Sequence, residues 1–284
     1  MKSSRLFKHT ALSAVFAGGL AFAGAGHAIV ITADTDANSL ATAVTSGGGL
    51  TVISASLSGH GSVATGGPVS SGTYTNASGT YGIGPGIVIS SGDVNEYNDG
   101  PNLTSGNTTI FGVAATAAQE ALLDPITGGS LNHNDVTQLD ITFTTSTGDV
   151  FFFVTFGSDE YPEFQNSSFI DAFGLYLNNT NIAFYNGDPI NIDHPDMTAC
   201  AGTELDGVLP CAGPMLFSAT GLDTSVNHTL TFIIADSGDA QLDSTAYINS
   251  LSGVTPNPVP EPASLALLGI GLAGLGAMRR RKTA

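Results

Sequence analysis

The most constraining feature of this chain is the absence of lysine and arginine between Lys8 and Arg279. All 24 aspartate and glutamate residues fall inside that interval, and all seven basic residues lie at the two ends. A buried carboxylate in the body must therefore be balanced by hydrogen bonds, by protonation or by a bound cation. Such an acidic surface also has no groups that replace phosphate counterions, which excludes nucleic acid as a partner.

The first 28 residues have the pattern of a secretory signal peptide. A basic start precedes an apolar stretch from Ala11 to Ala23, and small-residue motifs that end at Ala25 and Ala28 offer two cleavage sites. This order of basic, apolar and small residues directs export across a membrane. Residues 1–28 are therefore left out of the fold prediction.

The other end of the chain has the pattern of a membrane anchor. An uncharged apolar run from Ala263 to Met278 is followed by a basic cluster, Arg279, Arg280, Arg281 and Lys282. At about 1.5 Å per residue, a helix of this length is slightly short for a bilayer core of about 30 Å, and snorkelling arginines make up the difference. Residues 263–284 are predicted to be a transmembrane helix with a cytoplasmic basic tail.

A proline-rich linker, residues 254–262, precedes this helix and ends in Val259, Pro260, Glu261 and Pro262. The motif, the apolar helix and the basic tail, in this order, resemble the PEP-CTERM sorting segment of Gram-negative bacteria. The resemblance implies recognition by an exosortase, a membrane protease-transpeptidase, and delivery to the cell surface or the exopolysaccharide matrix. Prolines on both sides of Glu261 suit this role, because they keep the segment extended and accessible.

Residues 29–253 are predicted to form one mainly β domain, a jelly-roll-like β-sandwich with one or two short helices. Short apolar alternations in a sequence rich in Gly, Ser and Thr are typical of strands joined by tight turns. Phe151 to Phe153 are apolar on both faces, which indicates a central strand covered on both sides. The sequence from Asn178 to Asn181 separates two apolar segments and predicts a hairpin turn, because asparagine tolerates positive φ.

Two helices are expected in this body. One is capped by Asn38 or Ser39 and runs through Val44, and the other runs from Val113 to Asp124 and ends at Pro125.

The spacing of Asp34, Asp36 and Asn38 resembles the opening of an EF-hand loop. The required glycine is missing, and Thr45 stands where the bidentate glutamate belongs. Helix capping is the favoured interpretation of these residues.

Cys200 and Cys211 are the two cysteines of the chain. In an exported protein they predict a disulfide, which stabilises by about 3 kcal/mol for a loop of this size. A zinc site is the alternative, but no further ligands lie close in the sequence.

The body as a whole resembles the choice-of-anchor L domain over roughly residues 38 to 253. The resemblance rests on Ser158 to Phe164, with the sequence SDEYPEF, on Asp171 to Gly174, and on the strand sequences that follow. It implies a bacterial surface domain that occurs with various C-terminal anchors. It implies no biochemical activity.

Two groups of acidic residues follow apolar strands and are the candidate metal ligands. With no basic side chain nearby, partly desolvated carboxylates favour a hard divalent cation, and Ca²⁺ suits carboxylate, carbonyl and water ligands. Turn capping and solvation of the same residues is the alternative interpretation. The predicted ligands are Asp159, Glu160, Glu163, Asp171, Asp236 and Asp239.

No enzymatic activity is predicted, because the common nucleophile and zinc motifs are absent. Glu160 and Glu163 are a carboxylate pair of the kind that glycoside hydrolysis needs, but neighbouring loop positions do not define the required separation. Four scattered histidines favour structural roles: His60, His133, His194 and His228.

Two functions remain for an exported protein of this kind. The first is a structural or adhesive protein of the cell surface or exopolysaccharide matrix, sorted by an exosortase. The alternative is a calcium-dependent carbohydrate-binding module whose exposed tyrosines stack on sugars. The candidate tyrosines are Tyr74, Tyr81, Tyr97 and Tyr185.

Overall fold

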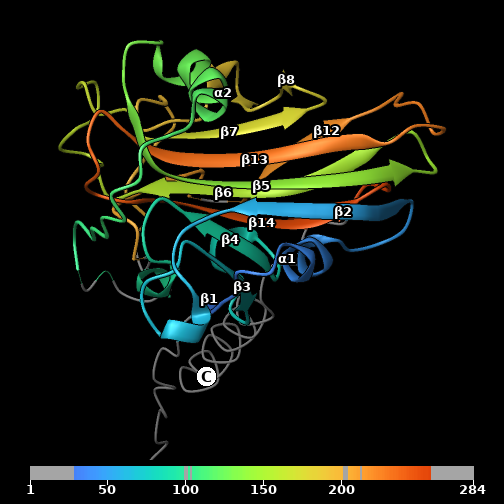
Figure 1. The fold of residues 1–284 in the computed structure, drawn as a ribbon, viewed down its shortest axis with the longest axis horizontal. Coiled ribbons are helices and arrows are strands. Elements are labelled where there is room, and N and C mark those ends of the chain that lie inside the picture. The colour runs from blue at the N-terminus through green and yellow to red at the C-terminus, as the bar shows by residue number, and fades with distance from the viewer. Residues whose placement is uncertain (1–28, 99–101, 103, 201–203, 212, 257–284) are drawn as a thin grey trace, which may run out of the picture.

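Two antiparallel β-sheets stacked face to face form the body of the protein (Figure 1). The computed structural model describes residues 29–98, 102, 104–200, 204–211 and 213–256. The predicted signal peptide, the sorting motif and the membrane helix lie outside the described residues. The predicted mainly β sandwich is confirmed.

The first sheet has seven strands. Its order is β1-β3-β4-β14-β6-β11, and β12 pairs with the part of β6 that β11 leaves free. The strands are β1 (Ile29–Ala33), β3 (Ser71–Asn76), β4 (Gly86–Ser90), β6 (Val150–Ser158), β11 (Gly207–Leu209), β12 (Met215–Ala219) and β14 (Ser244–Ser252).

The second sheet has five strands in the order β2-β5-β13-β7-β8. They are β2 (Leu50–Ser58), β5 (His133–Thr145), β7 (Ala172–Leu177), β8 (Thr180–Asn181) and β13 (His228–Ser237). A separate short pair is formed by β9 (Phe184–Tyr185) and β10 (Asp188–Pro189). The predicted hairpin is confirmed, since β7 pairs with β8 across Asn178 and Asn179, which have φ of 50° and 64°.

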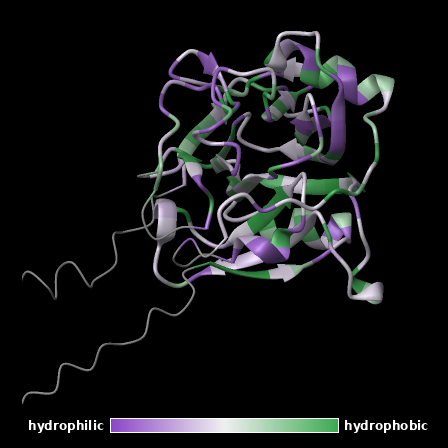
Figure 2. Ribbon diagram, turned by 90° about the vertical axis from the view of Figure 1, so that its left-hand side faces the viewer, coloured by the Kyte–Doolittle hydropathy of each residue, from purple (hydrophilic) through white to green (hydrophobic). Residues whose placement is uncertain are grey.

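The main core lies between the two sheets. Phe152, Val154 and Phe156 of β6 meet Phe232 and Ile234 of β13 there, and all five are 0% exposed. Figure 2 shows that the strands carry most of the hydrophobic positions and the loops most of the hydrophilic ones. The prediction of β6 as a central strand is confirmed, because it is hydrogen-bonded on both edges.

Helix α1 (Ala37–Val44) closes one end of this core with Leu40 and Val44. Its cap is Asp36, whose carboxylate accepts hydrogen bonds from the backbone N–H groups of Asn38 and Ser39. The capping interpretation is confirmed, but the capping residue lies two or three positions earlier than predicted.

Helix α2 (Ala117–Thr127) covers the outer face of the five-stranded sheet (Figure 1). It begins four residues later than predicted, at a capping box formed by Thr116 and Gln119. The prediction that Pro125 ends the helix is wrong, because Pro125 lies inside the last turn. Ile126 is buried against the sheet, and this packing holds the turn although the proline removes one hydrogen bond.

Among the residues described, no helix is long and apolar enough to cross a membrane.

Candidate metal centre

Acidic residues gather at the end of the sandwich opposite α1. β6 is followed by Asp159 and Glu160, β7 is preceded by Asp171, β13 contains Asp236, and β14 is preceded by Asp243. Antiparallel pairing of β6 with β14 and of β13 with β7 brings these strand ends together. Glu160, Asp171 and Asp236 interact electrostatically with one another and are called the acidic centre.

Asp171 links the two sheets at this end. One carboxylate oxygen accepts the backbone N–H of Ser237 in β13 at 3.0 Å, and the other accepts the hydroxyl of Ser244 in β14 at 2.8 Å. Burial, followed by the charge of Glu160, raises the pKa of Asp171 well above its ordinary value. The two hydrogen bonds counteract this shift only in part.

Asp236 is the least satisfied carboxylate. It is 0% exposed, and neither of its oxygens has a hydrogen-bond partner among the described residues. The hydroxyl of Ser91 is near enough to lower the pKa of Asp236, but it donates its hydrogen bond to the carbonyl oxygen of Ser244 at 3.4 Å. Burial and the charge of Asp171 outweigh this effect and raise the pKa of Asp236 well above its ordinary value.

Glu160 completes the acidic centre and is 1% exposed. Its Oε2 atom has no hydrogen-bond partner in the described part of the chain. Burial, then the charges of Asp239 and Asp236, raise the pKa of Glu160 to about 8. The acidic centre therefore presents three buried carboxylate oxygens without partners, one from Glu160 and two from Asp236.

Asp243, although buried beside the acidic centre, is hydrogen-bonded. Both oxygens accept the backbone N–H of Thr109, at 3.1 and 3.0 Å. Burial raises the pKa of Asp243 to about 7. Gly92 packs so closely that a Cβ atom there would lie 1.5 Å from a carboxylate oxygen of Asp243, so only glycine fits.

A second acidic feature, the acidic cleft, opens to solvent next to the end of β6. It has a volume of about 250 Å³, and its lining includes Asp159, Glu163, Asp206 and Phe164. Asp159 accepts backbone N–H groups from Asn107 at 2.9 Å and from Asp206 at 3.2 Å. Burial nevertheless raises the pKa of Asp159 to about 8.

The six predicted metal ligands thus separate into two neighbourhoods. Glu160, Asp171 and Asp236 form the acidic centre with Asp239 close by, and Asp159 and Glu163 line the acidic cleft. No three of the six bring ligand atoms within 4.8 Å of one another, among the residues that the structure describes. They do not form one closed coordination shell, and a bound metal stays a prediction.

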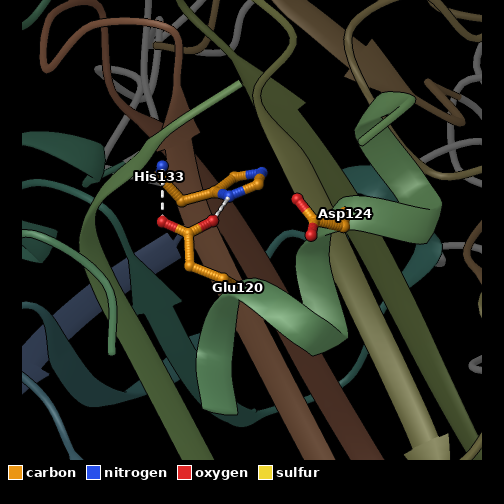
Figure 3. A group of neighbouring side chains, drawn as sticks. All are labelled: Glu120, Asp124 and His133. Carbon is orange, nitrogen blue, oxygen red and sulfur yellow. Dashed lines mark hydrogen bonds and ion pairs between the residues drawn. The ribbon is translucent and has the colours of Figure 1, made fainter. Parts of the chain in front are cut away.

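Two site features have no counterpart in the sequence-based prediction. Asp206 lies between the two cysteines, and only the fold brings it to Asp159. Glu120, Asp124 and His133 place three ligand atoms within 4.8 Å of one another (Figure 3). Their spacing of four and nine residues matches no common metal motif, so the sequence carries no clear signal for them.

The prediction of exposed tyrosine platforms is largely wrong. Tyr74, Tyr81 and Tyr97 are at most 4% exposed and belong to an apolar cluster on the outer face of the seven-stranded sheet. Tyr185 is partly buried and packs against His194, with ring centroids 5.6 Å apart.

Cys200 and Cys211 form the predicted disulfide, with a Cα–Cα distance of 5.5 Å.

Comparison with protein families supports both resemblances. The PEP-CTERM protein-sorting motif matches residues 258–282, which identifies an exported protein that an exosortase sorts to the cell surface. No curated protein and no solved structure matches the chain.

The family model of the Choice-of-anchor L domain matches residues 30–204, more than half of the chain. The strands that follow, β11 to β14, complete the same two sheets. Because this match covers most of the sandwich, the protein belongs to the choice-of-anchor L domain family.

Proposed function

We propose that the protein is a structural or adhesive component of the cell surface or the exopolysaccharide matrix, and that a divalent cation stabilises its sandwich at the acidic centre. Ca²⁺ fits this role best, because all available ligand atoms are oxygens and Ca²⁺ accepts flexible geometry with water in its shell. The role is one of binding, without catalysis.

The observation that carries this proposal is Asp236. A fully buried carboxylate with both oxygens unpartnered is costly, and the body has no lysine or arginine to pair with it. Protonation removes the charge but brings no hydrogen-bond donor to the remaining carbonyl oxygen. A cation coordinated by Asp236 and Glu160, with water completing the shell, satisfies the free oxygens of both residues.

The position of the acidic centre explains how a cation acts on the whole fold. Asp171 is bonded to β13 of one sheet and β14 of the other, and Asp236 lies in β13 beside it. An ion at this place neutralises mutual repulsion where the two sheets meet. It therefore stabilises a domain that is exported to an environment where divalent ions are available.

A calcium-dependent carbohydrate-binding module is the second candidate, and the acidic cleft favours it. Three acidic residues line a cavity of about 250 Å³ that is open to solvent, and Phe164 offers an apolar wall. An ion held by Glu163 and Asp206 leaves coordination positions for sugar hydroxyl groups. The tyrosines named from the sequence do not contribute to this surface.

Binding of the purified full chain to isolated exopolysaccharide and to a glycan array, with calcium or with chelator, tests the two candidates. A structural or adhesive role predicts retention on the polymer and no discrete sugar hits. Discrete, calcium-dependent hits that Asp206→Asn abolishes and the exposed control Asp188→Asn preserves would favour the carbohydrate-binding module. Absence of binding to both would refute the adhesive role and the module alike.

A further inference from the structure

Glu120, Asp124 and His133 form a cluster on the outer face of the five-stranded sheet (Figure 3). Glu120 and Asp124 lie one helical turn apart on α2, so their side chains share one face of the helix. His133 begins β5, directly beneath that face. One ligand atom from each residue lies within 4.8 Å of the other two.

His133 is held firmly in this position. It is 0% exposed, its Nδ1 atom is 2.5 Å from a Glu120 carboxylate oxygen, and its backbone N–H donates to the other oxygen at 3.2 Å. The Nε2 atom is 3.0 Å from the hydroxyl of Thr127. Each ring nitrogen thus has a polar neighbour, and when one nitrogen binds a metal the hydrogen bond of the other fixes the ring.

Asp124 distinguishes this cluster from a simple ion pair. Its carboxylate is turned toward the imidazole ring, and one of its oxygens lies within 4.8 Å of the ligand atoms of Glu120 and His133 (Figure 3). A histidine–glutamate pair requires no second carboxylate. Two carboxylates converging on one imidazole ring favour a further positive charge, and the body has no lysine or arginine to supply it.

We propose that Glu120, Asp124 and His133 bind a borderline transition-metal ion of the zinc class. One imidazole nitrogen with two carboxylates is a mixed N/O ligand set, which zinc accepts with water in the fourth position. Ca²⁺ prefers an all-oxygen shell, so the two ions select different sites on this protein. The site ties α2 to the first residue of β5.

The test is a zinc titration of the purified full chain in which calorimetry measures the binding. Millimolar calcium is present to saturate the acidic centre. Asp124→Asn and His133→Gln are each expected to weaken zinc binding by at least about tenfold. The control Asp188→Asn, on an exposed strand, is expected to leave it unchanged. Because His133 is buried and its variant can unfold, the partly exposed Asp124 provides the decisive comparison.

The visible absorption spectrum of bound Co²⁺ provides a second measurement. A purely structural role of the three residues would give no such absorption. Bound Co²⁺ is expected to give the intense visible absorption of a four-coordinate site, and Asp124→Asn to abolish it. Equal zinc affinity in the unchanged chain and in Asp124→Asn would overturn the proposal. So would the absence of zinc binding to the unchanged chain.

Discussion

At the scale of single residues, a chain without internal basic side chains shows how burial and charge compete. Hydrogen bonds to their carboxylates offset the burial of Asp171 and Asp243. The carboxylate of Asp236 has no hydrogen-bond partner among the described residues. The difference arises from position, because Asp236 lies within a central strand and the other two precede strands. Asp171 there reaches the ends of β13 and β14, and Asp243 reaches the loop N–H of Thr109.

Asp236→Asn tests this residue directly. Because an unpartnered buried charge costs more than an unpartnered amide, the variant in chelator at pH 8 is expected to gain at least about 1 kcal/mol in free energy of unfolding. It is also expected to lose the stabilisation that calcium gives. Urea denaturation with and without calcium measures both effects.

The matched control is Asp188→Asn, which removes an exposed carboxylate of β10. It is expected to change neither the stability nor the calcium response. A full calcium response in Asp236→Asn would show that the ion binds elsewhere.

At the scale of elements, the strands were predictable because each apolar run is long enough and bounded by turn residues. The burial of the tyrosines could not be predicted, because Tyr74, Tyr97 and Tyr247 form a second apolar layer outside the seven-stranded sheet. A sequence pattern indicates that a strand face is buried, but it does not indicate which distant loop covers it. Glu160 and Asp236 were predictable as ligand candidates because both follow apolar runs, whereas the partnership of Asp206 with Asp159 depends on tertiary contacts.

The end of α2 illustrates a similar limit. Proline in the last turn loses only one hydrogen bond, and the burial of Ile126 and Thr127 offsets that loss. Local propensity predicted the helix, and tertiary packing set its last residue.

The capping box of α2 gives a prediction at this scale. Thr116→Ala removes the side-chain acceptor of the Gln119 N–H group and is expected to cost about 1 kcal/mol in free energy of unfolding. Thermal denaturation compared with Thr220→Ala, an exposed loop position, measures it. Equal melting temperatures of the two variants would contradict the capping role.

The disulfide gives a second prediction. Replacing Cys200 and Cys211 together by serine releases a short loop and is expected to lower the free energy of unfolding by about 3 kcal/mol. Chemical denaturation of the double variant checks this, with the reduced unchanged chain as a control. A stability equal to that of the oxidised chain would show that the loop is held by other contacts.

At the scale of the whole molecule, the raised pKa values predict how stability depends on pH. The pKa is about 8 for Asp159 and Glu160 and about 7 for Asp243 in the folded protein, against about 4 in an unfolded chain. Between these values the folded state binds more protons than the unfolded state, so stability falls as pH rises.

In chelator, the melting temperature of the purified chain is therefore expected to decrease steadily from about pH 5 to about pH 8.5. A calorimetric series across this range measures the trend. A melting temperature that rises over the same interval would mean that the buried carboxylates are ionised and satisfied without an added ion.

Calcium response at pH 8 tests the central claim most directly. An ion that binds only the folded state adds about 2.7 kcal/mol when its concentration is 100 times the dissociation constant, or about 5–10 °C for a domain of this size. We predict a rise of this size when millimolar calcium replaces chelator, and a much smaller rise at pH 5. An unchanged melting temperature at pH 8 would contradict the proposal that a divalent cation balances the buried carboxylates.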